Sequence, residues 1–575
     1  MVKDIIIRHI KSIYPQEDAQ ALSAKICAAF DLPPDAAAGT GKSSSKAKPW
    51  SHEDSFLITY GDSLIGGNQR PLRNILDFLT GHLQNTVSAV HILPFFPFTS
   101  DDGFAVSDYE TVRADLGDWS DIAAIGKDFR LMADVVINHA SAGHEWFQQF
   151  LNDEAPGRDF IKTATAKDDV SAVTRPRPTP LLFAHDTKAG EKLVWCTFGP
   201  DQVDLDFSNP DLLLEFIRLL HFYIDKGVRV FRLDAVGFLW KQSGTSCLHL
   251  AETHEIIKLM RTLIDYLDEN IWLITETNVP AHENLEYFGN GNEAHLIYNF
   301  SLPPLLVHAL LTGRSTYLRR WMMTTAPTPE GCTILNFSAS HDGIGLRPVE
   351  GLLPPNEIAR MTDMVQQFGG RLTMRSYGDR EVPYEMNTTL FSALKGTVDG
   401  TDKMQIDRFI ASQTIMMSLE GIPAFYIQSF LASENDEARA AATGRNRSLN
   451  RRQWRVEEVD KQLANPDGPM AKVFYELRRR LAIRKQQTAF HPDATQFTLH
   501  IKPGMFGFWR QSLDRQQSLF VVTNITNRQK LLSLRDMNVY GSTKWVDLLS
   551  DTAIDPDDEE LVLMPYQTVW ISNQN

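Results

Sequence analysis

The feature that most constrains the fold is a repeat of strand, loop and helix that begins near residue 55. Strands that alternate with helices indicate a parallel sheet. Eight such units predict a closed (β/α)8 TIM barrel, an α/β fold. The eight predicted strands cover residues 56–62, 87–95, 130–139, 228–236, 272–278, 294–300, 332–342 and 421–429.

Two long gaps interrupt the repeat and predict inserted subdomains. The first, residues 140–215, follows the third strand and contains a proline-rich stretch. The second, residues 343–410, follows the seventh strand. Insertions at the carboxyl ends of barrel strands lie over the mouth of the barrel. The loop 375–387 carries Gly378, and we expect that it could move during a reaction cycle.

We assign the barrel to residues 51–139 and 216–489, and two further segments flank it. Residues 1–50 combine two amphipathic helices with a linker rich in Pro, Ala, Gly and Ser. Residues 490–575 contain short alternating strands separated by turns, which predict a small antiparallel β domain.

Composition disfavours several classes of partner. The net charge of -15 argues against nucleic acid and against anionic membrane surfaces. Apolar runs fall short of the roughly 18 residues that a membrane helix needs, and charges interrupt the N-terminal segment too often for a signal peptide, so we expect a cytoplasmic protein. The four cysteines form no C-x-x-C pair, which disfavours a zinc site or a disulfide framework. Monomer and homodimer both stay open.

Charged residues gather where the predicted strands end. The fourth strand delivers Arg232 and Asp234, the fifth Glu276, and the seventh His341 and Asp342. Carboxyl ends of barrel strands meet at one mouth, so these side chains should converge. Any one of them has an ordinary explanation, since a strand-end Asp often caps the next helix. It is their joint pattern that points to a site.

Three carboxylates at one mouth are typical of sugar-bond chemistry. A retaining reaction needs a carboxylate nucleophile and an acid/base group about 5–5.5 Å apart. A third carboxylate can orient sugar hydroxyls and raise the pKa of the acid. Histidines beside them can donate hydrogen bonds to the hydroxyls. Asp234, Glu276 and Asp342 are the candidates.

Four stretches around these residues resemble the motifs of the α-amylase superfamily; they are residues 134–139, 231–236, 274–277 and 338–342. Within it the chain resembles the sucrose phosphorylase subfamily, on residues 91–104, 174–178, 383–387 and 446–452. The N-terminal helices, the stretch AVTRPRP and residues 301–309 resemble glucosylglycerol and glucosylglycerate phosphorylases more closely still.

This resemblance implies a retaining phosphorylase that converts an α-D-glucoside and phosphate into α-D-glucose 1-phosphate. It implies Asp234 as the nucleophile, Glu276 as the acid/base and Asp342 as the transition-state stabiliser. The residues implied to hold the glucosyl unit are Asp101, Phe104, His139, Arg232, His341 and Arg447. Arg177 and Tyr384 match residues that receive phosphate in the subfamily.

The residues themselves also favour a phosphate site. Phosphate must compete with water for the glucosyl ester, so a phosphorylase needs a cationic pocket there. Arg175 and Arg177 can make bidentate phosphate contacts, and neighbouring prolines stiffen their loop. Asn138 stands where many α-amylases have a calcium ligand, but the resembling phosphorylases work without the metal. We therefore predict no metal and no organic cofactor, with phosphate and a small sugar as the partners.

The acceptor is predicted from Glu385, which stands where sucrose phosphorylases carry glutamine. A glutamate binds neutral hydroxyls well and should repel the carboxylate of glycerate, which favours 2-O-α-D-glucosylglycerol as the substrate. Arg380 lies nearby in the sequence and could neutralise a carboxylate, so glucosylglycerate stays open. Sucrose and sucrose 6-phosphate are further alternatives. A hydrolase or transglucosidase on the same barrel, or an inactive sugar-binding relative, would be a different class of protein.

Overall fold

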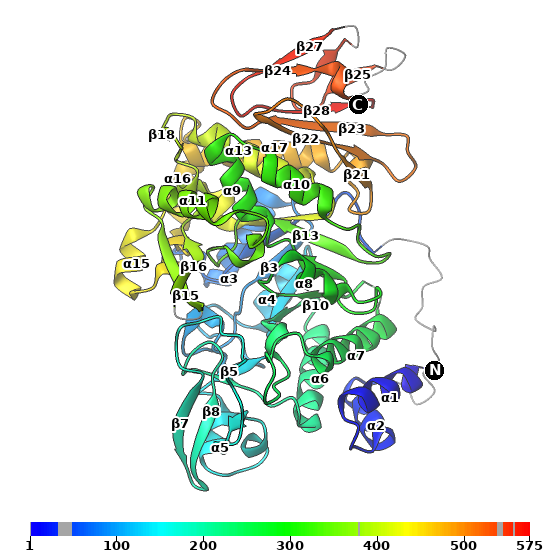
Figure 1. Cartoon of the computed structure of the whole chain (residues 1–575), viewed down its shortest axis with the longest axis vertical. Coiled ribbons are helices and arrows are strands. Elements are labelled where there is room, and N and C mark those ends of the chain that lie inside the picture. The colour runs from blue at the N-terminus through cyan, green and yellow to red at the C-terminus, as the bar shows by residue number, and fades with distance from the viewer. Residues whose placement is uncertain are drawn as a thin grey trace.

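A closed barrel of eight parallel strands forms the centre of the molecule, as predicted (Figure 1). The computed structural model describes residues 2–32, 49–268, 270–377, 380–537, 544–555 and 558–574. The strands follow one another around the barrel in sequence order. They are β1 (Phe56–Thr59), β3 (Ala89–Ile92), β4 (Arg130–Val136), β10 (Val228–Asp234), β11 (Trp272–Thr275), β12 (Leu296–Tyr298), β13 (Thr333–Phe337) and β19 (Ile422–Tyr426).

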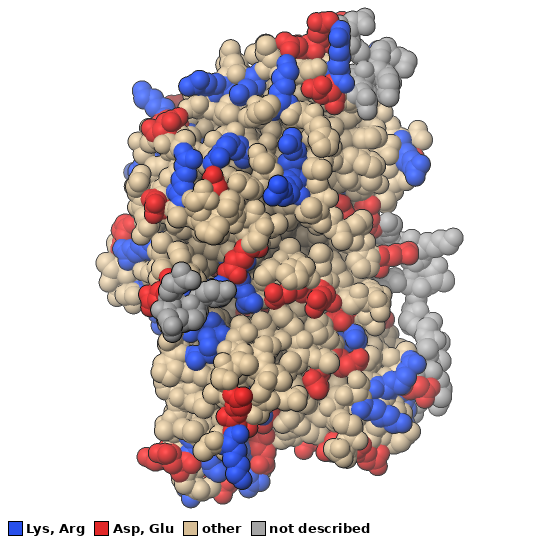
Figure 2. All heavy atoms as spheres, in the orientation of Figure 1, with Lys and Arg blue, Asp and Glu red and all other residues tan. Residues whose placement is uncertain are grey.

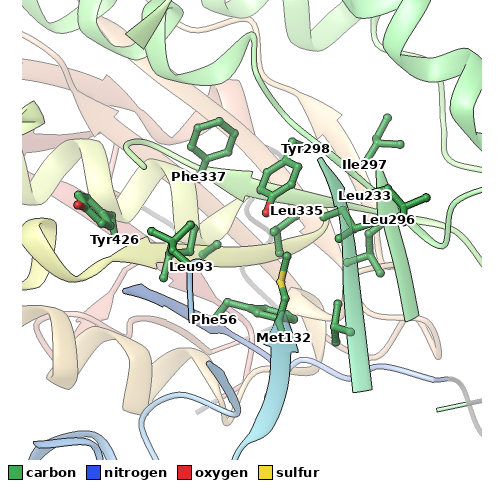
Figure 3. Close-up of a cluster of buried hydrophobic side chains, with 14 of the residues drawn as sticks. Phe56, Leu93, Met132, Leu233, Leu296, Ile297, Tyr298, Leu335, Phe337 and Tyr426 are labelled. Carbon is green, nitrogen blue, oxygen red and sulfur yellow. The ribbon is translucent and has the colours of Figure 1, made fainter. Parts of the chain in front are cut away.

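Closely packed apolar side chains from these strands support the mouth of the barrel. Figure 3 shows a cluster of them, including Phe56, Met132, Leu233 and Leu335 from four different strands, each with at most 2% of its surface exposed. Such packing has the density of an organic crystal and resists local rearrangement. The polar strand ends above it are therefore held on a rigid base.

Helices surround the barrel and connect its strands. In α6, Pro210 occupies the first turn and the Asn209 side chain accepts a hydrogen bond from the Asp211 backbone N–H, which starts the helix at this point. This helix runs across the predicted boundary between residues 215 and 216, so the first insertion ends at Asn209. The main helices are α3 (Pro71–Phe78), α4 (Trp119–Gly126), α6 (Pro210–Asp225), α7 (Ala251–Leu267), α9 (Leu302–Thr312), α10 (Thr316–Thr324), α13 (Gln405–Ser418) and α17 (Pro469–Arg484).

Two insertions lie over the mouth. The first begins and ends with an antiparallel pair in which His139 lies opposite Asp204. Its elements are β5 (His139–Ser141), α5 (Glu145–Leu151), β6 (Thr163–Ala164), β7 (Leu182–Thr187), β8 (Gly190–Trp195) and β9 (Gln202–Asp204). The second insertion forms a small sheet in the order β14 (Ile344–Gly345), β16 (Arg380–Asn387) and β15 (Arg371–Tyr377). The helix α11 (Pro355–Gln367) connects β14 to β15 along the chain.

The C-terminal residues form a six-stranded antiparallel sheet and a smaller two-stranded one on one end of the barrel domain (Figure 1). Arg510 joins the two parts: it is fully buried, and its guanidinium donates to the carbonyl oxygens of Ser418 (3.1 Å) and His491 (2.7 Å). The strands of this domain are β21 (Thr495–Thr498), β22 (Met505–Gln511), β23 (Ser518–Asn524), β24 (Lys530–Ser533), β25 (Trp545–Asp547), β26 (Thr552–Ile554), β27 (Glu560–Leu563) and β28 (Thr568–Ser572).

Two N-terminal helices, α1 (Val2–Ile13) and α2 (Ala19–Ala29), pack against α7 and α6 (Figure 1). The Tyr14 hydroxyl donates to the carbonyl oxygen of Phe207 (2.8 Å), and His9 Nδ1 lies 2.7 Å from a carboxylate oxygen of Glu255. Most of the linker that the sequence predicts after these helices, residues 33–48, lies outside the described residues.

Surface charge is mixed on the face that Figure 2 shows, where Lys and Arg are interspersed with Asp and Glu. Among the described residues, no helix combines the length and the apolar character that crossing a membrane requires.

The packing of α1 generates a stability prediction. Ile10→Ala removes a fully buried side chain and should lower the free energy of unfolding by about 2–5 kcal/mol, because it leaves a cavity against α7. Lys11→Ala, one residue further and exposed, should change it by less than about 0.5 kcal/mol. Denaturant unfolding and hydrogen exchange of α1 would measure both. Equal stability of the two variants would contradict this packing.

Candidate active site

Arg232 lies at the centre of the barrel mouth and contacts two aspartates. Its guanidinium Nη1 donates to Asp234 Oδ1 (2.7 Å), on the same strand, and to Asp134 Oδ1 of the neighbouring strand β4. The register places Arg232 directly beside Asp134, which explains why the two meet. Below them His91 Nε2 donates to Asp134 Oδ2 (2.7 Å). These four side chains are all buried and form a charged layer on the apolar base.

Glu276, just beyond the end of β11, lies on the other side of Arg232. Its Oε2 is 4.0 Å from Arg232 Nη2 and accepts a hydrogen bond from the Ala235 backbone N–H (3.0 Å). Ala235 has a left-handed backbone, with φ 50° and ψ 29°. This conformation costs a non-glycine residue on the order of 1 kcal/mol. It turns the chain sharply after Asp234 and directs the N–H toward Glu276.

Burial and neighbouring charge change the pKa values of this carboxyl pair. Removal from water raises the pKa of Asp234 to about 7, against the lowering effect of Arg232. Burial raises the pKa of Glu276 to about 7 as well, with the charges of Asp234 and Asp342 adding to the rise. Arg232 hydrogen-bonds Asp234 but reaches Glu276 only at 4.0 Å. The proton that the pair retains near neutral pH is therefore favoured on Glu276.

Asp342 has the opposite environment. Its Oδ1 lies 2.7 Å from Arg447 Nη1 and 3.9 Å from Arg451 Nη2. Although burial works against ionisation, these guanidinium groups and His341 hold the pKa of Asp342 well below its usual range. Asp342 thus supplies a permanent negative charge to the cavity that also contains the pair Asp234 and Glu276, the two groups in which retaining cleavage needs a nucleophile and an acid.

These residues line an open cavity at the mouth of the barrel. The Phe104 ring stacks on His341 with ring centroids 5.1 Å apart, which forms an apolar wall. His341 Nδ1 is buried and has no hydrogen-bond partner among the described residues. The cavity brings together the predicted residues Asp101, Phe104, His139, Arg232, Asp234, Glu276, His341, Asp342 and Arg447.

The predicted phosphate residues divide into two groups. Arg177 lines the cavity with Tyr384, and its guanidinium carbon lies 5.9 Å from the centre of the Tyr384 ring. Arg175 is not among the lining residues; its Nη2 donates instead to the carbonyl oxygen of Thr179, four residues along the same loop. The structure therefore corrects the expectation that Arg175 faces phosphate. The side chain of Arg380 lies outside the described part of the structure.

The structure also corrects the role predicted for Glu385. It is fully buried behind the cavity wall, and both carboxylate oxygens accept hydrogen bonds from Arg447, at 3.0 Å to Nε and 2.7 Å to Nη2. Because a guanidinium neutralises it at contact distance, Glu385 cannot repel an acceptor carboxylate as the sequence suggested. The argument that favoured a neutral acceptor is lost.

Several lining residues were missed by the sequence reasoning. Asn278 follows Glu276 by two residues and Arg347 follows Asp342 by five, so both could have been found by reading further past the strand ends. Gln202 comes from the first insertion, and its amide donates to Asp101 Oδ2 (3.3 Å). No local sequence signal marks it.

The position of Asn138 bears on the question of a metal. Its side-chain oxygen accepts a hydrogen bond from Lys241 Nζ (2.7 Å), and the same ammonium lies 3.0 Å from Asp204 Oδ2. All three side chains are buried. Among the described residues, no group of three or more His, Cys, Asp or Glu side chains is placed to hold a metal ion.

Comparison with known proteins identifies the family. The α-amylase catalytic domain matches residues 54–324. Three curated glucosylglycerate phosphorylases are 38 to 42% identical to the chain; that of Allomeiothermus silvanus is 42% identical over 524 residues, which cover 91% of each sequence. The chain belongs to the glycoside phosphorylases of the α-amylase superfamily.

The relatives of this phosphorylase also bear on the predicted acceptor. The glucosylglycerol phosphorylase of Marinobacter adhaerens is 30% identical, over 71% of the chain and 84% of that protein. The comparison therefore favours the glycerate alternative over the glycerol compound that the sequence put first. In structure, the phosphorylase resembles sucrose 6F-phosphate phosphorylase from Thermoanaerobacter thermosaccharolyticum, with a TM-score of 0.73 and 23% identity over 91% of the chain and 99% of that protein. This likeness concerns the fold.

The raised pKa of Glu276 generates a stability prediction. A carboxyl group whose pKa rises on folding destabilises the fold progressively as pH rises from its unfolded value, 4.5, to its folded value of about 7, and fully above that. Glu276→Gln removes this cost. The melting temperature of the variant should exceed that of the wild type by a few degrees at pH 8 and by much less at pH 5.

Thermal unfolding at the two pH values would measure this effect. Glu286→Gln changes an exposed glutamate ten residues further along the chain and should show no such dependence. A gain for Glu276→Gln that is equal at pH 5 and pH 8 would contradict the raised pKa.

Proposed function

We propose that the protein is a glucosylglycerate phosphorylase. It converts α-glucosylglycerate and inorganic phosphate reversibly into α-D-glucose 1-phosphate and glycerate. The single observation that carries the proposal is a cavity lined by Asp234, Glu276 and an arginine, Arg177, that has no carboxylate partner among the described residues. The family relationship supports the phosphorylase reaction.

In the first half-reaction Asp234 attacks the anomeric carbon and forms a β-glucosyl ester. Glu276 donates its proton to the leaving glycerate oxygen, which breaks the glycosidic bond. Arg232 keeps Asp234 ionised and oriented through its 2.7 Å hydrogen bond. Asp342 stabilises the positive charge that develops on the sugar ring. Side chains that hold the glucosyl unit are Asp101, Phe104, His139, His341 and Arg447.

In the second half-reaction phosphate attacks the anomeric carbon, displaces Asp234 and gives its proton to Glu276. Two inversions restore the α configuration of the product. Arg177 and Tyr384 receive the phosphate, since a guanidinium can contact two phosphate oxygens at once. No metal is required, because carboxylates and arginines supply the acid, base and charge stabilisation.

Glycerate is proposed as the acceptor on two grounds. The relatives named for it are more similar to this chain than the one named for glucosylglycerol. The residue that would have repelled a carboxylate, Glu385, is neutralised by Arg447.

A panel of four glucosides tests the substrate. Glucosylglycerate, glucosylglycerol, sucrose and sucrose 6-phosphate would each be incubated with phosphate, and glucose 1-phosphate release measured. We expect kcat/KM to be highest for glucosylglycerate by at least about tenfold, since a buried site that pairs a substrate charge discriminates against analogues that lack it. Asp234→Asn should abolish release. A higher kcat/KM for any other glucoside would refute the assignment.

The phosphate site has its own prediction. Arg177→Gln should raise the KM for phosphate about 10- to 100-fold, because a charge-assisted bidentate contact is lost. Hydrolysis of the glucosyl ester should then make up a larger share of turnover. Arg175→Gln is the matched control, since its guanidinium is used within its own loop. Equal phosphate KM values in the two variants would contradict the assignment.

A further inference from the structure

A second arginine lines the cavity without a close anionic partner. Arg347 begins a short 3-10 turn, Arg347–Val349, directly after β14. The turn is fixed at both ends: the Leu346 backbone N–H donates to the Tyr384 carbonyl oxygen (2.9 Å), and the Ser301 hydroxyl donates to the Pro348 carbonyl oxygen (2.9 Å). Hydrogen bonds to Tyr384, beside the proposed phosphate site, and to Ser301 of the barrel domain therefore fix the backbone that presents Arg347 to the cavity.

The guanidinium of Arg347 is held only loosely. Its Nη2 lies 3.6 Å from Glu283 Oε2, which is longer than a hydrogen bond. By contrast, Arg232 and Arg447 each contact carboxylates at 2.7 Å. With 16% of its side chain exposed, Arg347 retains donors that can turn toward a ligand in the cavity.

Glu283 is itself held in place from behind. His249 Nε2 lies 3.1 Å from Glu283 Oε2, and His249 Nδ1 lies 2.6 Å from the Tyr287 hydroxyl. Because a carboxylate only accepts hydrogen bonds, Nε2–H donates to Glu283 and Nδ1 accepts from Tyr287. Burial lowers the pKa of His249 to about 4, so the imidazole is neutral. Glu283 Oε2, fixed by this donor, lies 3.6 Å from Arg347 Nη2, which holds Arg347 near the cavity without a direct hydrogen bond.

An unpaired acceptor lies beside this arginine. Asn278 Oδ1 is buried and has no hydrogen-bond partner, although Asn278 lines the cavity two residues after Glu276. It packs so closely on the strand that leads to Arg347 that a Cβ at Gly345 would lie 2.9 Å from its side chain. This side of the cavity thus offers the guanidinium of Arg347 for an anion, on a strand held tightly by Asn278.

We propose that Arg347 binds the carboxylate of glycerate and determines the preference for an acidic acceptor. The inference rests on the proposed function and deepens it. In a double displacement, phosphate and acceptor approach the glucosyl unit in turn from the same side, and both are anions. Arg177, at the Tyr384 wall, serves phosphate. Arg347, on the wall formed by Asn278 and β14, serves the carboxylate.

The test compares an acidic with a neutral acceptor. Wild type and Arg347→Gln would be assayed in the synthetic direction with glucose 1-phosphate and either glycerate or glycerol, and for arsenate-dependent release of glucose from glucose 1-phosphate, which needs no acceptor. We expect the KM for glycerate to rise about 10- to 100-fold, the loss typical of a charge-assisted contact. The KM for glycerol and the arsenolysis rate should change by less than about threefold. Arg347→Lys should recover part of the glycerate affinity.

Other outcomes identify which claim fails. A parallel loss with glycerate, glycerol and arsenate would mean that Arg347 only supports the fold, and would overturn the inference. A raised KM for phosphate with unchanged glycerate affinity would overturn it by assigning Arg347 to phosphate. Wild-type enzyme that is inactive with glycerate would overturn the proposed function and this inference together, whereas an active wild type matched by Arg347→Gln would overturn the inference alone.

Glu283→Gln tests whether Glu283 positions Arg347. Removal of its charge should loosen Arg347 and raise the KM for glycerate about 3- to 10-fold, with the kcat for arsenolysis retained. An unchanged KM for glycerate in this variant would show that Glu283 does not position Arg347.

Discussion

The guanidinium of Arg232 is the group on which the mouth of the barrel depends. It joins Asp134 and Asp234 by hydrogen bonds and lies within 4.0 Å of Glu276, so three carboxyl groups on three different strand ends share one buried cation. Without it, two aspartates would be left in an apolar setting, where an uncompensated charge is strongly destabilising. Because the same cation hydrogen-bonds Asp234 but not Glu276, it favours the ionised form of Asp234 and leaves the proton on Glu276. Structural and chemical roles are thus combined in one side chain.

Charge pairing across the rest of the cavity follows a consistent pattern. Arg447 forms ion pairs with Asp342 and Glu385. Lys241 forms an ion pair with Asp204 and donates a hydrogen bond to Asn138. Among the described lining residues, Arg177 and Arg347 are the arginines without such a close partner. Arg232 and Arg447 are thus engaged by carboxylates of the protein, whereas Arg177 and Arg347 retain donors for a ligand.

The barrel and the convergence of its strand ends could be predicted because both depend on local pattern. Apolar runs mark strands, and Asp234, Glu276 and Asp342 follow from counting where those runs stop. Glu385 and Arg175 were misjudged because their roles depend on partners that the sequence does not place nearby, namely Arg447, 62 residues away, and a carbonyl oxygen within a folded loop. Gln202 was missed for the same reason, since its contact with Asp101 spans 101 residues.

The N-terminal helices have a consequence for the order in which the chain is made. Tyr14 donates to a carbonyl group 193 residues later, and His9 contacts a residue 246 positions further along, on α7. These two helices therefore have no surface to dock on until α6 and α7, about 200 residues later, have been synthesised. They pack against α6 and α7, the helices on either side of the strand that carries Arg232 and Asp234. Docking of α1 and α2 thus requires that α6 and α7 have already been placed on either side of this strand.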